Sequence, residues 1–183
     1  QYKMLGTVNE NGILTFSYRS DRPCRSLSST VSLIDKAELS SKNYSLVGSK
    51  RFTEEFTNRN PLCGPFAFTF YAFDLTSKDK VSLTTEIKRF IKDNFVYVLR
   101  DGVRVYPYGE KGIDWLNLDK LRSTYRAGQF ISYNDLTGFI YISQENNPRL
   151  KDASNRQGIV NTTGAYDDFT SLITAVTEIF NIE

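Results

Sequence analysis

The sequence predicts an α+β fold, in which a mixed β-sheet packs against helices. Residues that favour strands are abundant, with 13 Phe and 11 Tyr among 183 residues. Runs with strand-like alternation are interrupted by helix-like periodicity in no regular βαβ order. The chain closes on a stretch whose apolar residues recur at helical spacing. Strands, a helix, a hairpin, further strands and a final helix together indicate an α+β layer structure.

The stretch 96–118, VYVLRDGVRVYPYGEKGIDWLNL, organises the rest of the chain. Asp101-Gly102 separates two alternating runs, and both central residues of a tight hairpin turn need positive φ. Pro107 cannot donate a hydrogen bond to a neighbouring strand, and Gly109 permits unusual φ values. We therefore expect a hairpin whose second strand stops near Pro107, followed by a turn and an aromatic helical segment.

The N-terminal segment, residues 1–62, indicates one or two strands. The run 12–18, GILTFSY, lies between two turn-forming clusters and predicts a first strand. Residues 26–30 are small and polar, which indicates a linker, and residues 31–34 favour a short strand. Lys and Ser are scattered through residues 36–50, where the pattern leaves a mobile loop and an edge strand equally open.

Residues 63–183 predict an α+β domain that forms one compact unit with the N-terminal segment. The run 64–75, GPFAFTFYAFDL, is the strongest strand pattern in the chain. Apolar residues on both of its faces predict an interior strand that is covered on each side. Ser77-Lys78-Asp79 then opens a helix with an apolar stripe, which we expect to lie in the core. The stripe consists of Leu83, Ile87, Phe90 and Ile91.

Two further strands are predicted at residues 128–133 and 138–143. Asn147-Pro148 is a helix-start signal, because Asn caps free N–H groups and Pro is pre-shaped for the first helical position. We expect the short helix that follows to break near Ser154 and to lead into a loop at residues 154–158. The final helix starts near Thr162-Thr163. Its predicted buried stripe is Phe169, Leu172, Ile173, Val176 and Phe180.

Composition excludes several kinds of chemistry. The chain has no His, which removes Ser-His and Cys-His nucleophile arrangements. Cys24 and Cys63 lie far apart, so we interpret them as unrelated reduced thiols and expect no metal site. Phosphate-binding GxxxxGK[ST] and GxGxxG loops are absent from the sequence. The net charge of +2 neither requires nor excludes a nucleic-acid partner.

The sequence also bears on location. No run of 18 apolar residues occurs, so no membrane span and no membrane partner is expected. We expect a cytoplasmic protein. Gln1 is not an initiator residue, which favours a piece excised from a larger protein over a processed product.

Charged residues suggest three candidate features. The pairs Glu54-Glu55 and Asp167-Asp168 are interpreted as solvation and helix-end charge, since adjacent side chains point apart. Arg156 stands in a predicted loop, where phosphate-sensing arginines also occur. The hairpin interleaves basic and aromatic residues, which fits either a solvated face or a nucleic-acid surface. These hairpin residues are Arg100, Arg104, Tyr106, Tyr108 and Lys111.

Four blocks of the sequence together resemble one family. They are DGVRVYPYGEKGIDWLNLDKLR, NDLTGFIYIS, ENNPRLKDASNRQGIV and AYDDF, in that order. The combination is similar to the segment that follows the nucleotide domain in prokaryotic ATPases of the gyrase B, heat-shock chaperone, histidine kinase and MutL (GHKL) superfamily. The resemblance covers roughly residues 64–180, and residues 1–60 contribute little to it.

The resemblance implies a transducer domain with a ribosomal-protein-like fold and a left-handed βαβ crossover. Members bind ATP and Mg²⁺ in a separate N-terminal domain, the Bergerat fold, whose metal-binding Asn and DxGxG loop have no counterpart here. The implied partners are that domain and, in the parent protein, a second copy. By resemblance, Asn155, Arg156 and Gly158 match the family's nucleotide-sensing NRxG loop. Arg156 is then the residue that contacts the γ-phosphate, with Lys151 as the alternative.

Within the same blocks, Trp115 is the single Trp and is expected to anchor the packing of the domain. Two other functions remain open from the sequence. One is a stand-alone module that presents the hairpin 96–111 to nucleic acid or protein. The other is a secreted adhesin-like domain, which rests only on Gln1 and the two cysteines and which a disulfide between Cys24 and Cys63 would favour.

Overall fold

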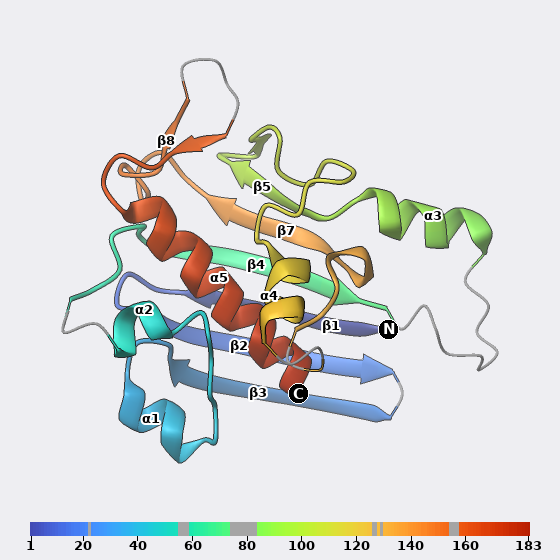
Figure 1. Cartoon of the computed structure of the whole chain (residues 1–183), viewed down its shortest axis with the longest axis horizontal. Coiled ribbons are helices and arrows are strands. Elements are labelled where there is room, and N and C mark those ends of the chain that lie inside the picture. The colour runs from blue at the N-terminus through green and yellow to red at the C-terminus, as the bar shows by residue number, and fades with distance from the viewer. Residues whose placement is uncertain (22, 55–58, 74–83, 126–127, 129, 154–157) are drawn as a thin grey trace.

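Seven strands form one mixed sheet in the order β3-β2-β1-β4-β7-β5-β6 (Figure 1). This computed structural model describes residues 1–21, 23–54, 59–73, 84–125, 128, 130–153 and 158–183. All neighbouring strands are antiparallel except β5 and β7, which are parallel. The strands are β1 Tyr2–Val8, β2 Ile13–Asp21, β3 Cys24–Ser32, β4 Phe66–Ala72, β5 Val96–Arg100, β6 Val103–Arg104 and β7 Leu136–Ile142.

The long C-terminal helix and most of the short helices lie on one side of this sheet, and the predicted α+β fold is confirmed (Figure 1). The longest helix, α5, crosses the sheet. A separate pair of short strands, β8 (Lys151–Asp152) and β9 (Ile159–Val160), forms a small hairpin. The helices are α1 Lys36–Ser41, α2 Lys50–Thr53, α3 Thr85–Asp93, α4 Leu118–Thr124 and α5 Ala165–Ile182, with a 3₁₀ turn at Tyr133–Asp135.

The connection between the parallel strands β5 and β7 is left-handed. It passes through β6 and α4 on the side that α5 occupies, and then returns to the neighbouring strand (Figure 1). Crossovers of this kind are right-handed in about 98% of cases. The left-handed path is the one that the family resemblance led us to expect.

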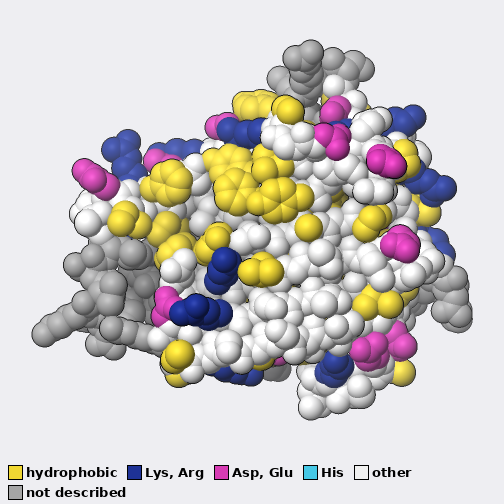
Figure 2. Space-filling view, turned by 180° about the vertical axis from the view of Figure 1, so that it is seen from behind, with side chains coloured by type: hydrophobic (Ala, Val, Ile, Leu, Met, Phe, Trp, Pro, Cys, Tyr) yellow, Lys and Arg dark blue, Asp and Glu magenta, His cyan; other side chains and the backbone are white. Residues whose placement is uncertain are grey.

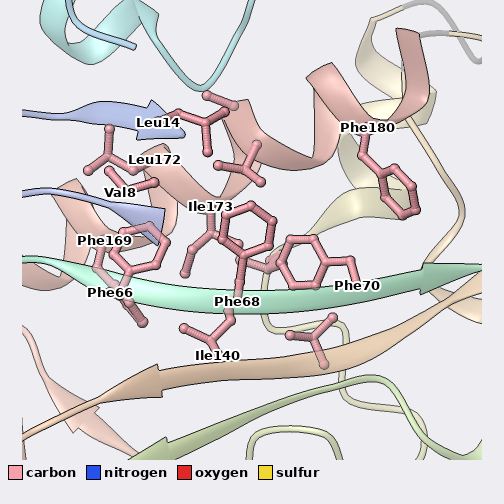
Figure 3. Close-up of a cluster of buried hydrophobic side chains, with 14 of the residues drawn as sticks. Val8, Leu14, Phe66, Phe68, Phe70, Ile140, Phe169, Leu172, Ile173 and Phe180 are labelled. Atoms are coloured by element: carbon pink, nitrogen blue, oxygen red, sulfur yellow. The ribbon is translucent and has the colours of Figure 1, made fainter. Parts of the chain in front are cut away.

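The core lies between the sheet and α5, and its centre is phenylalanine from β4 (Figure 3). Phe66, Phe68 and Phe70 point toward α5 and are at most 4% exposed. Gly6 and Gly138 stand opposite Phe68 and Phe70 on the neighbouring strands, which leaves room for the rings. The predicted stripe of α5 is buried along its whole length, so that prediction is confirmed.

Only one face of β4 is covered, so the prediction of cover on both sides is wrong. Its burial alternates between buried and partly exposed residues from Phe66 to Ala72. The apolar side chains Ala67 and Tyr71 misled the interpretation, because apolar residues also line the open face of this antiparallel sheet.

The N-terminal segment supplies three strands, one more than the sequence indicated. β1 was missed, because Lys3 and Gly6 interrupt its alternation. The predicted linker 26–30 lies inside β3, where serine and threonine hydroxyls hydrogen-bond across to β2. Its polar residues face solvent or occupy the sheet edge, so a strand there needs few apolar residues.

Residues 36–50 form neither a loop alone nor an edge strand. Asp35 caps α1, since its carboxylate accepts hydrogen bonds from the amides of Ala37 and Glu38. The buried side chains Leu39 and Phe52 attach α1 and α2 to the core. Neither helix is long enough to show a clear periodicity in the sequence.

Two other predictions for the middle of the chain are corrected. The apolar stripe of α3 is not in the core, since Ile87 is 45% and Phe90 is 65% exposed, and Ile91 is its buried residue. The predicted helix start at residues 77–79 lies outside the described residues. Among the described residues of 128–133 there is no strand, whereas β7 confirms the strand predicted at 138–143.

Candidate functional site

The predicted sensor loop joins the two strands of the β8–β9 hairpin. Lys151 lies on β8, exposed, and pairs with Val160 on β9. The amide of Ala153 donates to the carbonyl of Gly158 at 2.9 Å, which brings the two ends of the loop 154–157 together. Asn155 and Arg156 lie outside the described residues. In Figure 1, β8 lies at one corner of the molecule, beyond the end of β7.

The short helix predicted from Asn147 to Ser154 is wrong, because the segment forms turns and then β8. The side chain of Asn147 is buried and bonds to backbone groups of other segments. Its Oδ1 accepts from the amide of Ser143 at 2.9 Å, and its Nδ2 donates to the carbonyls of Cys63 at 2.7 Å and Pro65 at 2.8 Å. Asn147 therefore ties the end of β7 to the start of β4.

Arg100 fixes β8 to the main sheet. Its Nη1 lies 2.8 Å from Oδ1 of Asp152, and its Nη2 donates to the carbonyl of Leu150. The side chain is about nine-tenths buried, and its Nε has no hydrogen-bond partner among the residues that the structure describes. The two terminal nitrogen atoms of Arg100 thus bond to Leu150 and to Asp152, both in the segment that leads into the loop.

Two tyrosines fix the other end of the loop. The hydroxyl of Tyr108 accepts a hydrogen bond from the amide of Ile159 at 2.9 Å, and the carbonyl of Tyr106 accepts from the amide of Gly158 at 2.8 Å. Gly158 has φ +90°, and an added Cβ would lie 3.3 Å from the Tyr108 hydroxyl. Glycine therefore suits this position both for its backbone and for its closeness to Tyr108.

Trp115 connects this arrangement to α5. Its ring packs against that of Tyr108 at a centroid distance of 4.8 Å and stacks on that of Phe169 at 6.5 Å. Its Nε1 donates to the carbonyl of Val96 on β5 at 2.9 Å. The side chain is partly buried and belongs to the core, as expected for a packing anchor.

Asp114, beside Trp115, caps α4. Its two carboxylate oxygens accept hydrogen bonds from the amides of Leu118 and Asp119, each at 2.9 Å. Burial raises the pKa of Asp114, and the two amide hydrogen bonds oppose that shift. The DWL block therefore has two structural tasks: starting α4 and supporting the aromatic junction.

A hollow of about 480 Å³ lies between the β5–β6 hairpin and Gly158. Arg100, Arg104, Tyr106 and Asp152 are among the residues that line it. Arg100 is paired with Asp152, and Arg104 is paired with Glu110 at 2.6 Å. Because Arg100 and Arg104 already have carboxylate partners, we do not interpret this hollow as an anion-binding site. Its residues hold the segment next to the loop in place.

The hairpin 96–111 does not form one basic surface. Arg100 and Tyr108 are buried on the covered side, and Lys111 pairs with Asp93 at 2.9 Å. Arg104 lies on the open side of the sheet, with its guanidinium 4.5 Å from the ring centre of Tyr97. The positive φ values of Asp101 and Gly102 confirm the predicted turn.

Buried charges on α5 were not found from the sequence. Asp168 is fully buried and accepts hydrogen bonds from Arg51 at 2.7 Å, from Arg59 at 2.6 and 2.9 Å, and from the amide of Leu62 at 2.8 Å. Burial raises its pKa, but the hydrogen bonds from Arg59, Arg51 and Leu62 outweigh burial and leave the pKa below its usual value. The interpretation of Asp168 as solvated charge is therefore wrong.

A second buried carboxylate holds the same N-terminal segment. Glu178 accepts hydrogen bonds from the amides of Val47 and Gly48, each at 2.9 Å. An added Cβ on Gly48 would lie 2.3 Å from the amide nitrogen of Ala175, so the backbone rests directly on α5. Residues 47–62 are thus attached to α5 through charged groups at two places. The sequence did contain a signal for these buried charges. Asp168 and Glu178 lie within the apolar pattern of α5, and two arginines, Arg51 and Arg59, precede it.

The two cysteines are not paired, and the described carboxylates are not clustered. Cys24 is exposed and Cys63 buried, and both are free thiols, so the disulfide of the adhesin hypothesis is absent. Burial raises the pKa of Cys63 to about 12, which leaves its thiol protonated. Among the described residues, no group of three or more Cys, Asp or Glu side chains is placed to hold a metal ion.

No helix in the described part of the chain combines the length and the apolar character that crossing a membrane requires.

Comparisons of this chain with protein-family models, with curated proteins and with solved structures find no match.

Proposed function

We propose that this chain is the energy-transducing domain of a GHKL-type ATPase, working in the cytoplasm. The loop 154–157 carries Arg156 to the γ-phosphate of an ATP molecule that a separate domain binds. Lys151, exposed at the base of the same hairpin, is the second cation within reach of that phosphate. Hydrolysis removes the phosphate contact, and the change is passed to the rest of the domain.

One observation carries the proposal: the blocks that create the family resemblance contact one another in the fold. Tyr108, from the RVYPYG block, bonds to Ile159, which follows the NRQG block. Trp115, from the DWL block, packs against Tyr108 and Phe169, and Phe169 ends the AYDDF block. The left-handed crossover between β5 and β7 adds a rare feature that the resemblance had implied.

The contacts of the hairpin suit it for transmitting force. Arg100 and Tyr108 attach both ends of the loop to the β5–β6 segment, and Trp115 attaches that segment to α5. A pull on Arg156 would therefore reach the long helix through packed side chains and hydrogen bonds. This path is a physical connection, and the coupling along it is part of the proposal.

The residues of this chain fit a contribution to a nucleotide site and not the whole site. The described residues hold no metal-binding cluster, and the arginines beside the hairpin are paired with carboxylates. On this proposal ATP and Mg²⁺ are held by the N-terminal ATP-binding domain of the parent protein, and a second copy of the parent is a further partner. This chain adds the positive charge that stabilises the phosphoryl group in the transition state.

Single-turnover ATP hydrolysis by the parent protein tests the role of Arg156. We expect Arg156→Ala to slow the chemical step by about 10²–10³-fold, as for loss of a charge-stabilising donor. Arg156→Lys should recover only part of the rate, because Lys keeps the charge without the planar fork. Arg149→Ala is the matched control, since Arg149 is exposed in the turn before β8. A wild-type rate in both Arg156→Ala and Lys151→Ala would refute this sensor loop.

Calorimetry on the isolated chain provides an independent check. Without an adenine pocket or a metal ligand, ATP should bind more weakly than about 10 μM, which corresponds to roughly 7 kcal/mol. Tighter binding would show a nucleotide site within the chain itself and would contradict the proposal. The proposal would also be contradicted if the coding sequence of the parent protein contained no ATP-binding domain upstream of this segment.

A further inference from the structure

The uncovered face of the main sheet carries a row of aromatic side chains. Tyr97 on β5 stands beside Phe139 on β7, and Tyr141 follows two residues later on the same face. We call Tyr97, Phe139 and Tyr141 the aromatic row. Figure 2, which views the molecule from this side, shows hydrophobic side chains gathered in one cluster with basic side chains near it.

The rings of the aromatic row are stacked and partly exposed. The planes of Tyr97 and Phe139 differ by 21° at a centroid distance of 5.7 Å, and those of Phe139 and Tyr141 by 29° at 6.4 Å. Phe139 is 39% and Tyr141 is 43% exposed. Tyr97 is held from the other side by Arg104 and by Gly109, whose added Cβ would lie 2.4 Å from the Tyr97 ring. The row is therefore fixed at one end and open at the other.

Cations lie on the same face, on the side of the row away from Tyr97. Lys3 on β1 lies over the ring of Tyr71 at 5.4 Å, and Arg19 follows on β2. Both line a shallow hollow of about 530 Å³. Neither forms an ion pair with a carboxylate among the described residues. Asp21, at the end of β2, is the one acidic side chain among the described strand residues of this face.

We propose that this face binds an unpaired nucleic-acid strand, with bases on the aromatic row and phosphates at Lys3 and Arg19. Aromatic rings two residues apart on one strand, with another on its neighbour, are the means by which open sheets stack about two or three bases. At the usual strand spacing β7 and β2 lie about 14 Å apart. One nucleic-acid strand can therefore place bases on the aromatic row and phosphates at Lys3 and Arg19 together. This inference does not depend on the ATPase proposal.

Charge and ring geometry favour this occupant over a second protein surface. Stacking needs accessible π-faces, and every base offers one, whereas a duplex keeps its bases covered. Lys3 and Arg19, which form no ion pair within the described part of the chain, favour a polyanion. The sugar has no assigned contact, so RNA and DNA strands should bind within about threefold of each other.

Fluorescence anisotropy on the whole chain measures this binding directly. Labelled oligothymidylate and oligouridylate of about 12 nucleotides should bind with a dissociation constant of about 1–100 μM at 50 mM salt. Two phosphate contacts give a salt slope near −1.4, so affinity should fall about sevenfold between 50 and 200 mM salt. A duplex of the same length should bind more weakly than either strand.

Variants on the two sides of the molecule localise the site. Phe139→Leu and Tyr141→Val keep strand propensity but remove a ring, and each should weaken binding at least about fivefold. Lys3→Gln with Arg19→Gln should remove most of the salt dependence. The controls Tyr125→Leu and Lys120→Gln change an exposed Tyr and an exposed Lys on or next to α4, on the covered side, and should alter affinity less than about twofold.

Four results would overturn the inference. They are no saturable binding below about 1 mM, equal binding by the ring variants, preference for a duplex, and self-association that Phe139→Leu abolishes. The last would show that a second copy of this chain covers the face. Circular dichroism and thermal unfolding of each variant establish that it is folded before its binding is compared.

Discussion

The two faces of β4 and β7 show how one pair of strands serves two purposes. On the covered face Phe66, Phe68 and Phe70 meet α5 and are almost fully buried, while on the open face Thr69 and Tyr71 are only partly buried (Figure 3). The covered side holds most of the apolar core. Substitutions can therefore alter stability and surface chemistry separately in this sheet, because alternate residues of the same strand face different surroundings.

The covered side is also held by buried carboxylates, whereas the Arg104–Glu110 ion pair on the open side is partly exposed. Asp168 and Glu178 point from α5 to the segment that contains α2, and each accepts several hydrogen bonds. On the open side the cross-strand contacts include hydroxyl pairs such as Ser17 and Ser28 at 2.9 Å and the exposed ring contact of Tyr97 with Phe139. Substitutions on the covered side should therefore cost far more stability.

The largest effect is expected at Trp115. Trp115→Ala removes ring contacts with Tyr108 and Phe169 and a hydrogen bond to Val96, and should lower the free energy of unfolding by about 3–5 kcal/mol. Trp115→Phe keeps an aromatic ring and should cost about half as much. Urea unfolding curves measure both. A loss below about 1 kcal/mol for Trp115→Ala would show that the junction does not stabilise the fold.

Asp168→Asn should follow, with a loss of about 3 kcal/mol at neutral pH, because Arg51 and Arg59 lose their buried carboxylate partner. The neighbouring Asp167→Asn is the matched control. Asp167 is about half exposed and lies 3.8 Å from Arg51, so its replacement should change stability by less than about 0.5 kcal/mol. Equal losses in the two variants would contradict the buried cluster as the source of stability.

The same carboxylate makes stability depend on pH. The pKa of Asp168 is lowered in the folded state, so its contribution is complete above the unfolded pKa of about 3.9. It is lost as pH falls below that value toward the folded pKa. The difference between the wild type and Asp168→Asn should therefore be constant from about pH 5 to 7 and should shrink below about pH 4. A difference that stays constant below pH 4 would mean that folding does not lower the pKa of Asp168.

Local signals in the sequence predicted the elements that local chemistry determines. Asp101-Gly102 predicted the β5–β6 hairpin because the turn depends on two adjacent residues. The apolar spacing of α5 predicted its buried stripe. Residues 26–30 of β3 were taken for a linker because a strand on the edge of a sheet, with one open face, tolerates Ser and Thr. α1 and α2 were missed because long-range contacts such as Glu178 to Gly48 hold that segment.

The candidate site divides in the same way. The position of Gly158 at the end of a loop followed from the turn-forming residues around it, whereas Lys151, which was expected in a short helix, lies on β8. Their supports could not be predicted, because Arg100 meets Asp152 and Tyr108 meets Ile159 only after β5, β7 and the small hairpin are assembled. The aromatic row was hidden for the same reason, since Tyr97 and Phe139 become neighbours through a parallel pairing.

Among apolar side chains, a smaller effect on stability is expected on the open face than in the core. Phe139→Ala removes a ring that is 39% exposed and should cost about 1 kcal/mol, mainly from its contacts with Tyr97 and Tyr141. Phe70→Ala on the neighbouring strand is the matched variant. Phe70 is 0% exposed, so its loss should cost about 3–5 kcal/mol. If urea unfolding gave equal losses, the two faces would be equally packed and the aromatic row would not be free to bind a ligand.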